Sequence, residues 1–126
     1  MTLERSDTPA SRVADPDLTS AQFHILLTLA EGQRHGYGIM EEVEARTGGA
    51  VELGPGTLYR SLKQLLTRGL IVEVPDRKGG QTEAGTQRRS YDLTPEGRIR
   101  TVEEAQRLRA LVRWAEDAMV LEGGRP

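Results

Sequence analysis

The sequence predicts a mainly α-helical domain that carries a small β-hairpin and ends in one long helix. Three observations predict this fold class: apolar residues recur every three or four positions in four segments, two short β-branched or aromatic runs flank a polar stretch, and no helix breaker interrupts residues 98–121. The 126 residues suffice for one domain with an appended helix. We expect a disordered or flexible arm over residues 1–17 and a compact domain over residues 18–94. A long helix should follow over residues 95–121, and a flexible tail over residues 122–126.

Charge and composition restrict the classes of function. The net charge of −2 gives no overall reason to expect a polyanion partner. Basic side chains are nevertheless concentrated in the middle, because residues 54–100 carry nine basic and five acidic side chains, whereas residues 1–53 carry four and nine. The absence of cysteine excludes disulfides and thiolate metal sites. No apolar segment resembles a signal peptide or a membrane span, so we expect a cytoplasmic protein. The glycine-rich stretches match no phosphate-binding loop, so we expect no cofactor.

The first helix is predicted from its start signal. Residues 1–17 are polar, contain two prolines and show no periodicity, which is typical of a disordered arm. Thr19 and Gln22 then form a capping-box pattern, and a strongly apolar run follows as far as Gly32. Because this helix is apolar most of the way round, we expect it in the core.

A second helix is expected from Gly36 or Tyr37 to Thr47, ending at the Gly48-Gly49 pair. Its periodicity predicts that Ile39, Met40 and Val43 point inward. The acidic residues Glu41, Glu42 and Glu44 should point outward. The linking segment 51–54 could pair as a strand.

The third helix, within GPGTLYRSLKQLLTRGLI, has clear ends, since Pro55 suits a first helical turn and Gly69 a left-handed stop. One side is an apolar stripe at i, i+4, i+7 and i+8, namely Leu58, Leu62, Leu65 and Leu66. The other side contains no acidic residue and consists of Tyr59, Arg60, Lys63, Gln64 and Thr67.

Two strands and a final helix complete the chain. The segments 70–74 and 88–93 flank a twelve-residue polar stretch, 75–86, and predict a hairpin with a long tip. Thr94 and Pro95 are an N-cap and a first-turn proline for a helix to residue 121. At about 35 Å it is too long to bury its apolar positions on so small a domain, so we expect a second copy of the chain as partner. Those positions are Ile99, Val102, Ala105, Leu108, Leu111, Val112, Ala115, Ala118 and Met119.

Three helices followed by a hairpin form a winged helix-turn-helix. In this arrangement the third helix lies in the major groove of double-stranded DNA, and the hairpin reaches the neighbouring backbone or minor groove. Most amphipathic helices with basic outer faces are merely solvated. Here the acid-free face, the basic hairpin strand and the central positive segment together favour DNA binding by Arg60, Lys63, Gln64, Thr67, Arg88 and Arg89.

Three motifs in order, HGYGIMEEVEARTGG, LGPGTLYRSLKQLLTRGLI and RRSYDLTPEGR, resemble the PadR family of bacterial transcriptional regulators over roughly residues 20–115. The resemblance implies a homodimeric repressor that binds a palindromic operator, with a single C-terminal helix as in the short subfamily. It implies DNA contacts for Tyr37, Thr57, Tyr59 and Lys63 and for the wing arginines Arg88 and Arg89. Family members often have Pro or Thr at the position of Arg60, so a base contact from Arg60 is inferred from its outward position alone.

The expected dimer interface comprises Ile99, Val102, Leu108, Leu111, Val112, Ala115 and Met119. Some short members of the resembled family hold planar aromatic effectors between the two copies. By that resemblance an effector pocket would be formed by Leu108, Leu111, Trp114 and Ala115, although interface packing also accounts for Trp114.

Several alternatives accompany this interpretation. Tyr37 and Tyr59 fit either phosphate contacts or core positions. His24 and His35 make no convincing zinc site without cysteine, and His35 fits a capping or packing role. Ser61 and His35 lack the third group of a catalytic set, so we expect no enzyme. The rival functions are a winged-helix module that binds another protein and not DNA, and a small-molecule binding protein without regulatory output.

Overall fold

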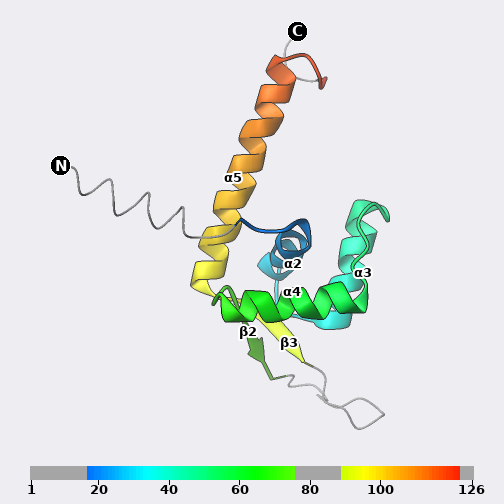
Figure 1. Cartoon of the computed structure of the whole chain (residues 1–126), viewed down its shortest axis with the longest axis vertical. Helices are drawn as coiled ribbons and strands as arrows, with labels where there is room; N and C mark the ends of the chain where they lie inside the picture. Colours follow the sequence, from blue (N-terminus) through cyan, green and yellow to red (C-terminus); the bar gives the residue numbers. More distant parts are fainter. Residues whose placement is uncertain (1–16, 76–88, 123–126) are drawn as a thin grey trace, which may run out of the picture.

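The architecture agrees with the predicted fold class. The structure is a computed structural model, and it describes residues 17–75 and 89–122. Figure 1 shows a compact helical body, a small sheet below it and one long helix that rises away from both. In chain order the elements are α2 (Ser20–Ala30), β1 (Arg34–His35), α3 (Gly36–Thr47), α4 (Pro55–Thr67), β2 (Ile71–Val74), β3 (Ser90–Leu93) and α5 (Pro95–Asp117). The expected arm, most of the wing tip and the last four residues lie outside the described part.

Helix α2 is the central element, in contact with α3, α4, α5 and β3. Its capping box is confirmed: the Gln22 amide donates to Thr19 Oγ1 at 3.0 Å, and the Thr19 amide donates to Gln22 Oε1 at 3.0 Å. These bonds satisfy backbone donors that a helix start leaves without partners. The predicted core position is also confirmed, since Ile25, Leu26 and Leu29 are fully buried.

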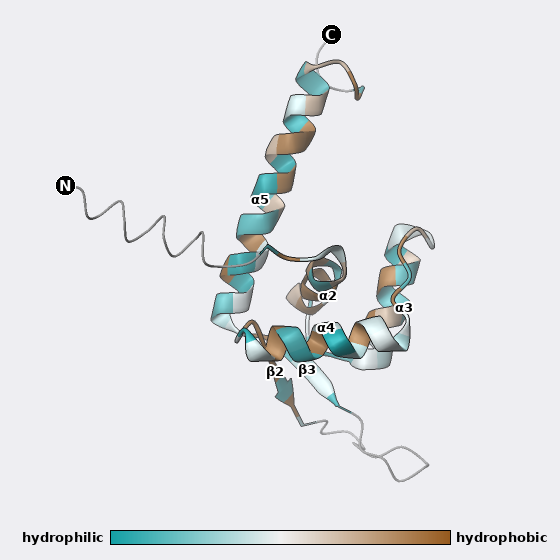
Figure 2. Ribbon diagram, viewed as in Figure 1, coloured by the Kyte–Doolittle hydropathy of each residue, from teal (hydrophilic) through white to brown (hydrophobic). Residues whose placement is uncertain are grey.

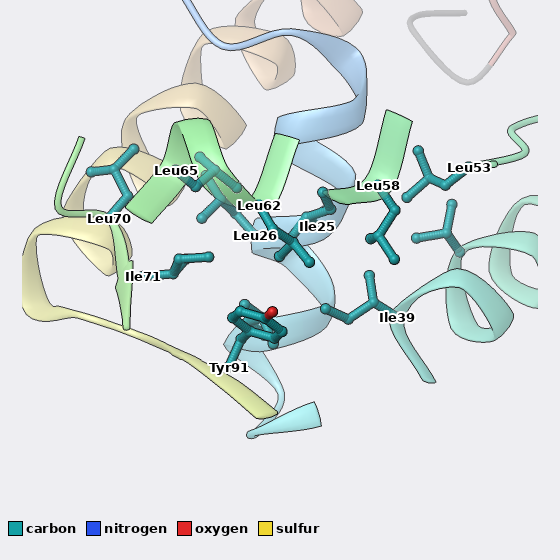
Figure 3. Close-up of a cluster of buried hydrophobic side chains, with 12 residues drawn as sticks. Ile25, Leu26, Ile39, Leu53, Leu58, Leu62, Leu65, Leu70, Ile71 and Tyr91 are labelled. Atoms are coloured by element: carbon teal, nitrogen blue, oxygen red, sulfur yellow. The ribbon is translucent and has the colours of Figure 1, made fainter. Parts of the chain in front are cut away.

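One apolar cluster joins the helices to the sheet. Leu58, Leu62 and Leu65 of α4 are at most 1% exposed, which confirms the predicted stripe. Figure 3 shows them directed toward Ile25 and Leu26 of α2, with the remaining labelled side chains closing the cluster around them. The other buried members are Leu29, Ile39, Val43, Leu53, Leu70, Ile71 and Tyr91.

The sheet contains one strand that the sequence did not predict. Its order is β1-β3-β2, antiparallel throughout, with Arg34 and Glu73 both opposite Tyr91. The segment 51–54 was the expected extra strand, and that expectation is wrong, because Leu53 is buried in the core and β1 occupies the free edge of β3. A strand of two residues has no periodicity by which a sequence could reveal it.

The start of α5 is fixed to the turn that follows α4. The Gly97 amide donates to the N-cap side chain of Thr94 at 2.9 Å, and the Thr94 hydroxyl donates to the Gly69 carbonyl at 2.7 Å. Gly97 lies so close to this turn that a Cβ added there would be 1.9 Å from the Leu70 carbonyl oxygen. The junction therefore requires glycine and sets the direction in which α5 leaves the domain.

Helix α5 ends at Asp117, four residues before the predicted end. Met119 has a left-handed backbone, with φ of 65°, and lies in the terminating turn. The Met119 amide bonds the Glu116 carbonyl, and the Val120 amide bonds the Ala115 carbonyl. This pair of bonds is a Schellman ending, which glycine normally supplies, so the sequence contained no stop signal.

The predicted apolar stripe of α5 divides into two faces. Near its start α5 contacts α2, and its buried residues there are Gly97, Thr101 and Glu104. Counted at about 100° per residue, the same face continues as Leu108, Leu111, Val112 and Ala115, whereas Ile99 and Val102 lie roughly 140–200° away from Gly97. Figure 2 shows hydrophobic segments recurring along the distal part of α5, beyond its contact with α2. The expectation of one continuous stripe from Ile99 to Met119 is therefore wrong.

The buried face of α5 includes a charged residue that is held by two arginines. Glu104 is 6% exposed, with Arg107 Nη2 at 2.6 Å and Arg100 Nη1 at 3.4 Å from its carboxylate oxygens. The hydrogen bond from Arg107 lowers the pKa of the Glu104 carboxyl, although burial opposes the shift.

In residues 17–75 and 89–122, no helix is both long and apolar enough to cross a membrane.

The contact at Gly97 predicts a large and specific loss of stability. Gly97→Ala should lower the free energy of unfolding by about 1–3 kcal/mol or more, because the methyl group would overlap the Leu70 carbonyl. Gly38→Ala in α3 is the control, since nothing lies within 4 Å of its Cβ position, and stability should stay unchanged or rise by up to ~1 kcal/mol. Urea unfolding at one fixed protein concentration measures both changes. Equal stability of Gly97→Ala and the parent would contradict the junction.

Candidate nucleic-acid interface

The outer face of α4 is polar, exposed and without acidic residues. Arg60, Lys63 and Thr67 lie within about 60° of one another on the side opposite Leu58 and Leu62, and all three are exposed. Burial of the leucines thus fixes which way the basic side chains point. This face is the one that the sequence predicted to contact DNA.

Gln64 has a partner inside the domain. Its side-chain oxygen accepts a hydrogen bond of 2.9 Å from Gln22 Nε2. Gln22 is 5% exposed and uses its own oxygen in the α2 capping box, where Arg68 Nη1 also lies at 3.5 Å. Gln64 therefore anchors α4 to the start of α2, a role that sequence reasoning missed, and its contact with DNA stays a prediction.

The N-termini of α3 and α4 lie close together, and neither helix has an acidic side chain in its first turn to offset the positive end of its dipole. The N-cap of α4 is Gly54 and that of α3 is His35; neither helix has a side-chain capping bond or an acidic residue in its first turn. The backbone amides and the positive ends of these helix dipoles therefore favour an approaching anion. His35 occupies the predicted cap position, but its side chain does not cap the helix.

Tyr59 connects these two helix starts. A Cβ added to Gly36 would lie 2.9 Å from the Tyr59 hydroxyl oxygen, so the tyrosine ring of α4 lies directly over the first residue of α3. Tyr59 is 51% exposed and Tyr37 is 60% exposed, which excludes the core alternative for both; Tyr91 is the buried tyrosine of the domain. The motifs around Gly36 and Tyr59 are thus parts of one surface, with Thr57 half-buried at the start of α4.

The β2–β3 hairpin, which we call the wing, has one of its two predicted contact arginines in the described part of the chain. This residue, Arg89, forms an ion pair with Glu73. Arg89 Nη1 lies 2.6 Å from Glu73 Oε2, across the hairpin. Hydrogen bonding and charge attraction from Glu73 hold the pKa of Arg89 above its ordinary value. Burial, with a smaller contribution from Glu73, raises the pKa of Tyr91. Arg88, the other predicted wing contact, lies outside the described residues.

The remaining polar groups form no catalytic or metal site in the described ranges. Ser61 is buried in the α4 interface at 4% exposed, which agrees with rejecting it as a nucleophile. Within residues 17–75 and 89–122 no three His, Asp or Glu side chains are placed to hold a metal ion. A small hollow between α2 and α3 is rimmed by the ion-paired Glu31 and Arg46, 2.7 Å apart.

The distal part of α5 exposes apolar surface. Leu111 and Val112 are nearly half exposed, Leu108 and Ala115 are half-buried, and Trp114 is 69% exposed. Trp114 lies about 100° around the helix from Ala115, on the flank of the apolar face. Because these side chains are half-buried to exposed in the described part of the chain, the predicted effector pocket would need a second copy to cover it.

Comparison with known proteins agrees with this architecture. Residues 25–103 match the model of the transcriptional regulator PadR-like family. The chain is 34% identical over 94 residues to the transcriptional regulator Rv3488 of Mycobacterium tuberculosis, covering 75% of this chain and 80% of that protein. It is also 36% identical over 91 residues to an uncharacterised 37.1 kDa transposon protein of Streptomyces fradiae, covering 72% of this chain but only 24% of that protein.

A solved structure shows the same fold. Bacillus subtilis PadR in complex with operator DNA superposes with a TM-score of 0.60 at 22% identity, covering 69% of this chain and 47% of that one. The family match spans more than half of the sequence and includes the α4 surface, both strands of the hairpin and the start of α5. The chain belongs to the PadR-like family of transcriptional regulators, and it is a regulator rather than an enzyme.

Proposed function

We propose that the chain is a DNA-binding repressor that acts in the cytoplasm as a homodimer on a palindromic operator. The observation that carries this proposal is the acid-free, exposed face of α4 beside two uncapped helix starts. The operator complex of Bacillus subtilis PadR, a protein of the same fold, supports it.

In this proposal α4 enters the major groove. Arg60 contacts a base edge, because arginine to guanine is the commonest specific contact, and Lys63 and Thr67 contact the groove or backbone beside it. Amide groups at the starts of α3 and α4, with the hydroxyls of Tyr37, Thr57 and Tyr59, receive phosphates. Arg88 and Arg89 bring the wing to the flanking backbone.

The second copy covers the distal apolar face of α5. Leu111 and Val112 are nearly half exposed and Leu108 and Ala115 half-buried, and a two-fold axis through this face would bury them further on both copies. Two α4 helices then lie about 34–36 Å apart, one turn of DNA, as a palindrome requires. Ile99 and Val102, which lie off this face, are no longer proposed as interface residues. Met119 lies in the turn after the helix and stays a proposed interface residue.

An effector would act through the same contact. A planar aromatic molecule between the two copies, against Leu108, Leu111, Trp114 and Ala115, would release DNA if it binds better to a dimer with the wrong helix separation. The competing proposal, a module that binds protein and not DNA, is less well supported, because it gives no reason for an acid-free face on α4.

Two substitutions on α4 should have different effects on DNA affinity. Lys63→Ala should weaken binding to every sequence and reduce the slope of log affinity against log salt by about 0.9, one lost phosphate contact. Arg60→Ala should instead relax preference at one base pair by about 1–3 kcal/mol. Salt titrations on a selected duplex and on its single-base variants measure both effects. If both variants bind every duplex as the parent does, α4 does not contact DNA through this face.

Substitutions on the two faces of α5 should separate in their effect on self-association. Leu111→Asp should weaken the dimer by more than about tenfold, since it removes a buried leucine from each copy and adds two charges. Ile99→Asp introduces the same charge on the opposite side and should leave the dimer intact. Sedimentation equilibrium measures both. Dissociation by Ile99→Asp and not by Leu111→Asp would place the partner on the other face.

A further inference from the structure

We propose that Glu73 lowers the affinity of the chain for DNA, because it holds Arg89 in an ion pair that a phosphate must displace. This role rests on the DNA-binding function proposed above. It assigns a task to the acidic side chain that pairs with the described wing arginine.

The hairpin register brings the two side chains together. Glu73 of β2 is directly opposite Tyr91 of β3, and Arg89 precedes Tyr91 by two residues, so all three point to the same side of the sheet. Glu73 and Arg89 are diagonal neighbours at the tip end, where long side chains reach each other, and their Nη1 and Oε2 atoms are 2.6 Å apart.

The pair lies on the side of the sheet that faces the helices. Ile71 and Tyr91 alternate with the outward residues and are at most 3% exposed in the core. Figure 3 shows the Tyr91 ring directed from β3 toward α2 and α4. The Arg89–Glu73 pair continues the same row beyond the edge of the core, where the side chains become 65% and 39% exposed. The pair therefore lies on the helix side of the hairpin, at the edge of the core, and is exposed to solvent.

A carboxylate and a phosphate compete for the same guanidinium. Arginine forms similar charge-assisted hydrogen bonds with both, so Arg89 can bind a phosphate only by leaving Glu73. Each contact of Arg89 with a phosphate therefore requires the loss of its pair with Glu73, at the operator and on other DNA alike. Glu73 thus reduces the affinity that this positive charge can add, because DNA binding depends on the number of neutralised phosphates.

The test compares Glu73→Gln with Glu122→Gln in the full chain. Glu122 is an exposed residue beyond the end of α5, and Figure 1 shows this end of α5 far from β2 and β3, so the control removes the same charge elsewhere. Affinities are measured over a salt series on a duplex selected by the parent protein and on a scrambled duplex of equal length. Glu73→Gln should bind the scrambled duplex about three- to fivefold more tightly, and the selected duplex should gain at least as much, because Arg89 no longer has to leave a carboxylate to reach a phosphate. Glu122→Gln should resemble the parent on both duplexes.

Arg89→Gln and the double variant determine whether Glu73 acts through Arg89. In the Arg89→Gln background, Glu73→Gln should no longer increase affinity for the scrambled duplex. An equal gain with and without Arg89 would mean simple repulsion of DNA by the carboxylate and would overturn the proposal. So would the absence of a gain on both duplexes. A parent protein that binds neither duplex would remove the proposed function itself, which distinguishes the two failures.

Discussion

Burial of the leucine face of α4 is the constraint on which the rest of the structure depends. Leu58, Leu62 and Leu65 are packed against α2 and the sheet, so the helix cannot rotate without exposing them to water. The opposite face is thereby held outward, and its arginine, lysine and threonine acquire a fixed orientation. The same packing carries Tyr59 over the start of α3, which joins two helix N-termini into one surface.

The connection between α4 and α5 explains how dimerisation could control DNA binding. Thr94 and Gly97 contact the Gly69-Leu70 turn that follows α4. There is no room for a Cβ on Gly97 next to the Leu70 carbonyl oxygen. In the proposed dimer, a change in the angle between the two α5 helices would move each α4 with it, because Gly97 packs directly on the Leu70 carbonyl. A proposed effector between the α5 helices would thereby act on the position of α4.

Much of this fold was predictable from local signals, and the errors have physical causes. The capping box of α2, both ends of α4 and its leucine stripe follow from short-range rules, and all are confirmed. The stripe on α5 was misassigned because its buried face begins with Gly97, Thr101 and Glu104, which hydrophobic periodicity does not detect. The Glu73–Arg89 and Gln22–Gln64 contacts depend on register and on helix placement, which no local pattern contains. The DNA contacts of the named α4 residues stay predictions.

The most direct test of a dimer that reads DNA through α4 is selection of bound fragments from genomic DNA by the purified protein at two salt concentrations. The account predicts enrichment of a palindrome whose half-sites are about one helical turn apart, and its retention at the higher salt. Binding without enrichment would contradict the assignment of base contacts to α4, and a single unpaired half-site would contradict the dimer. No binding at either salt would favour a protein-interaction module.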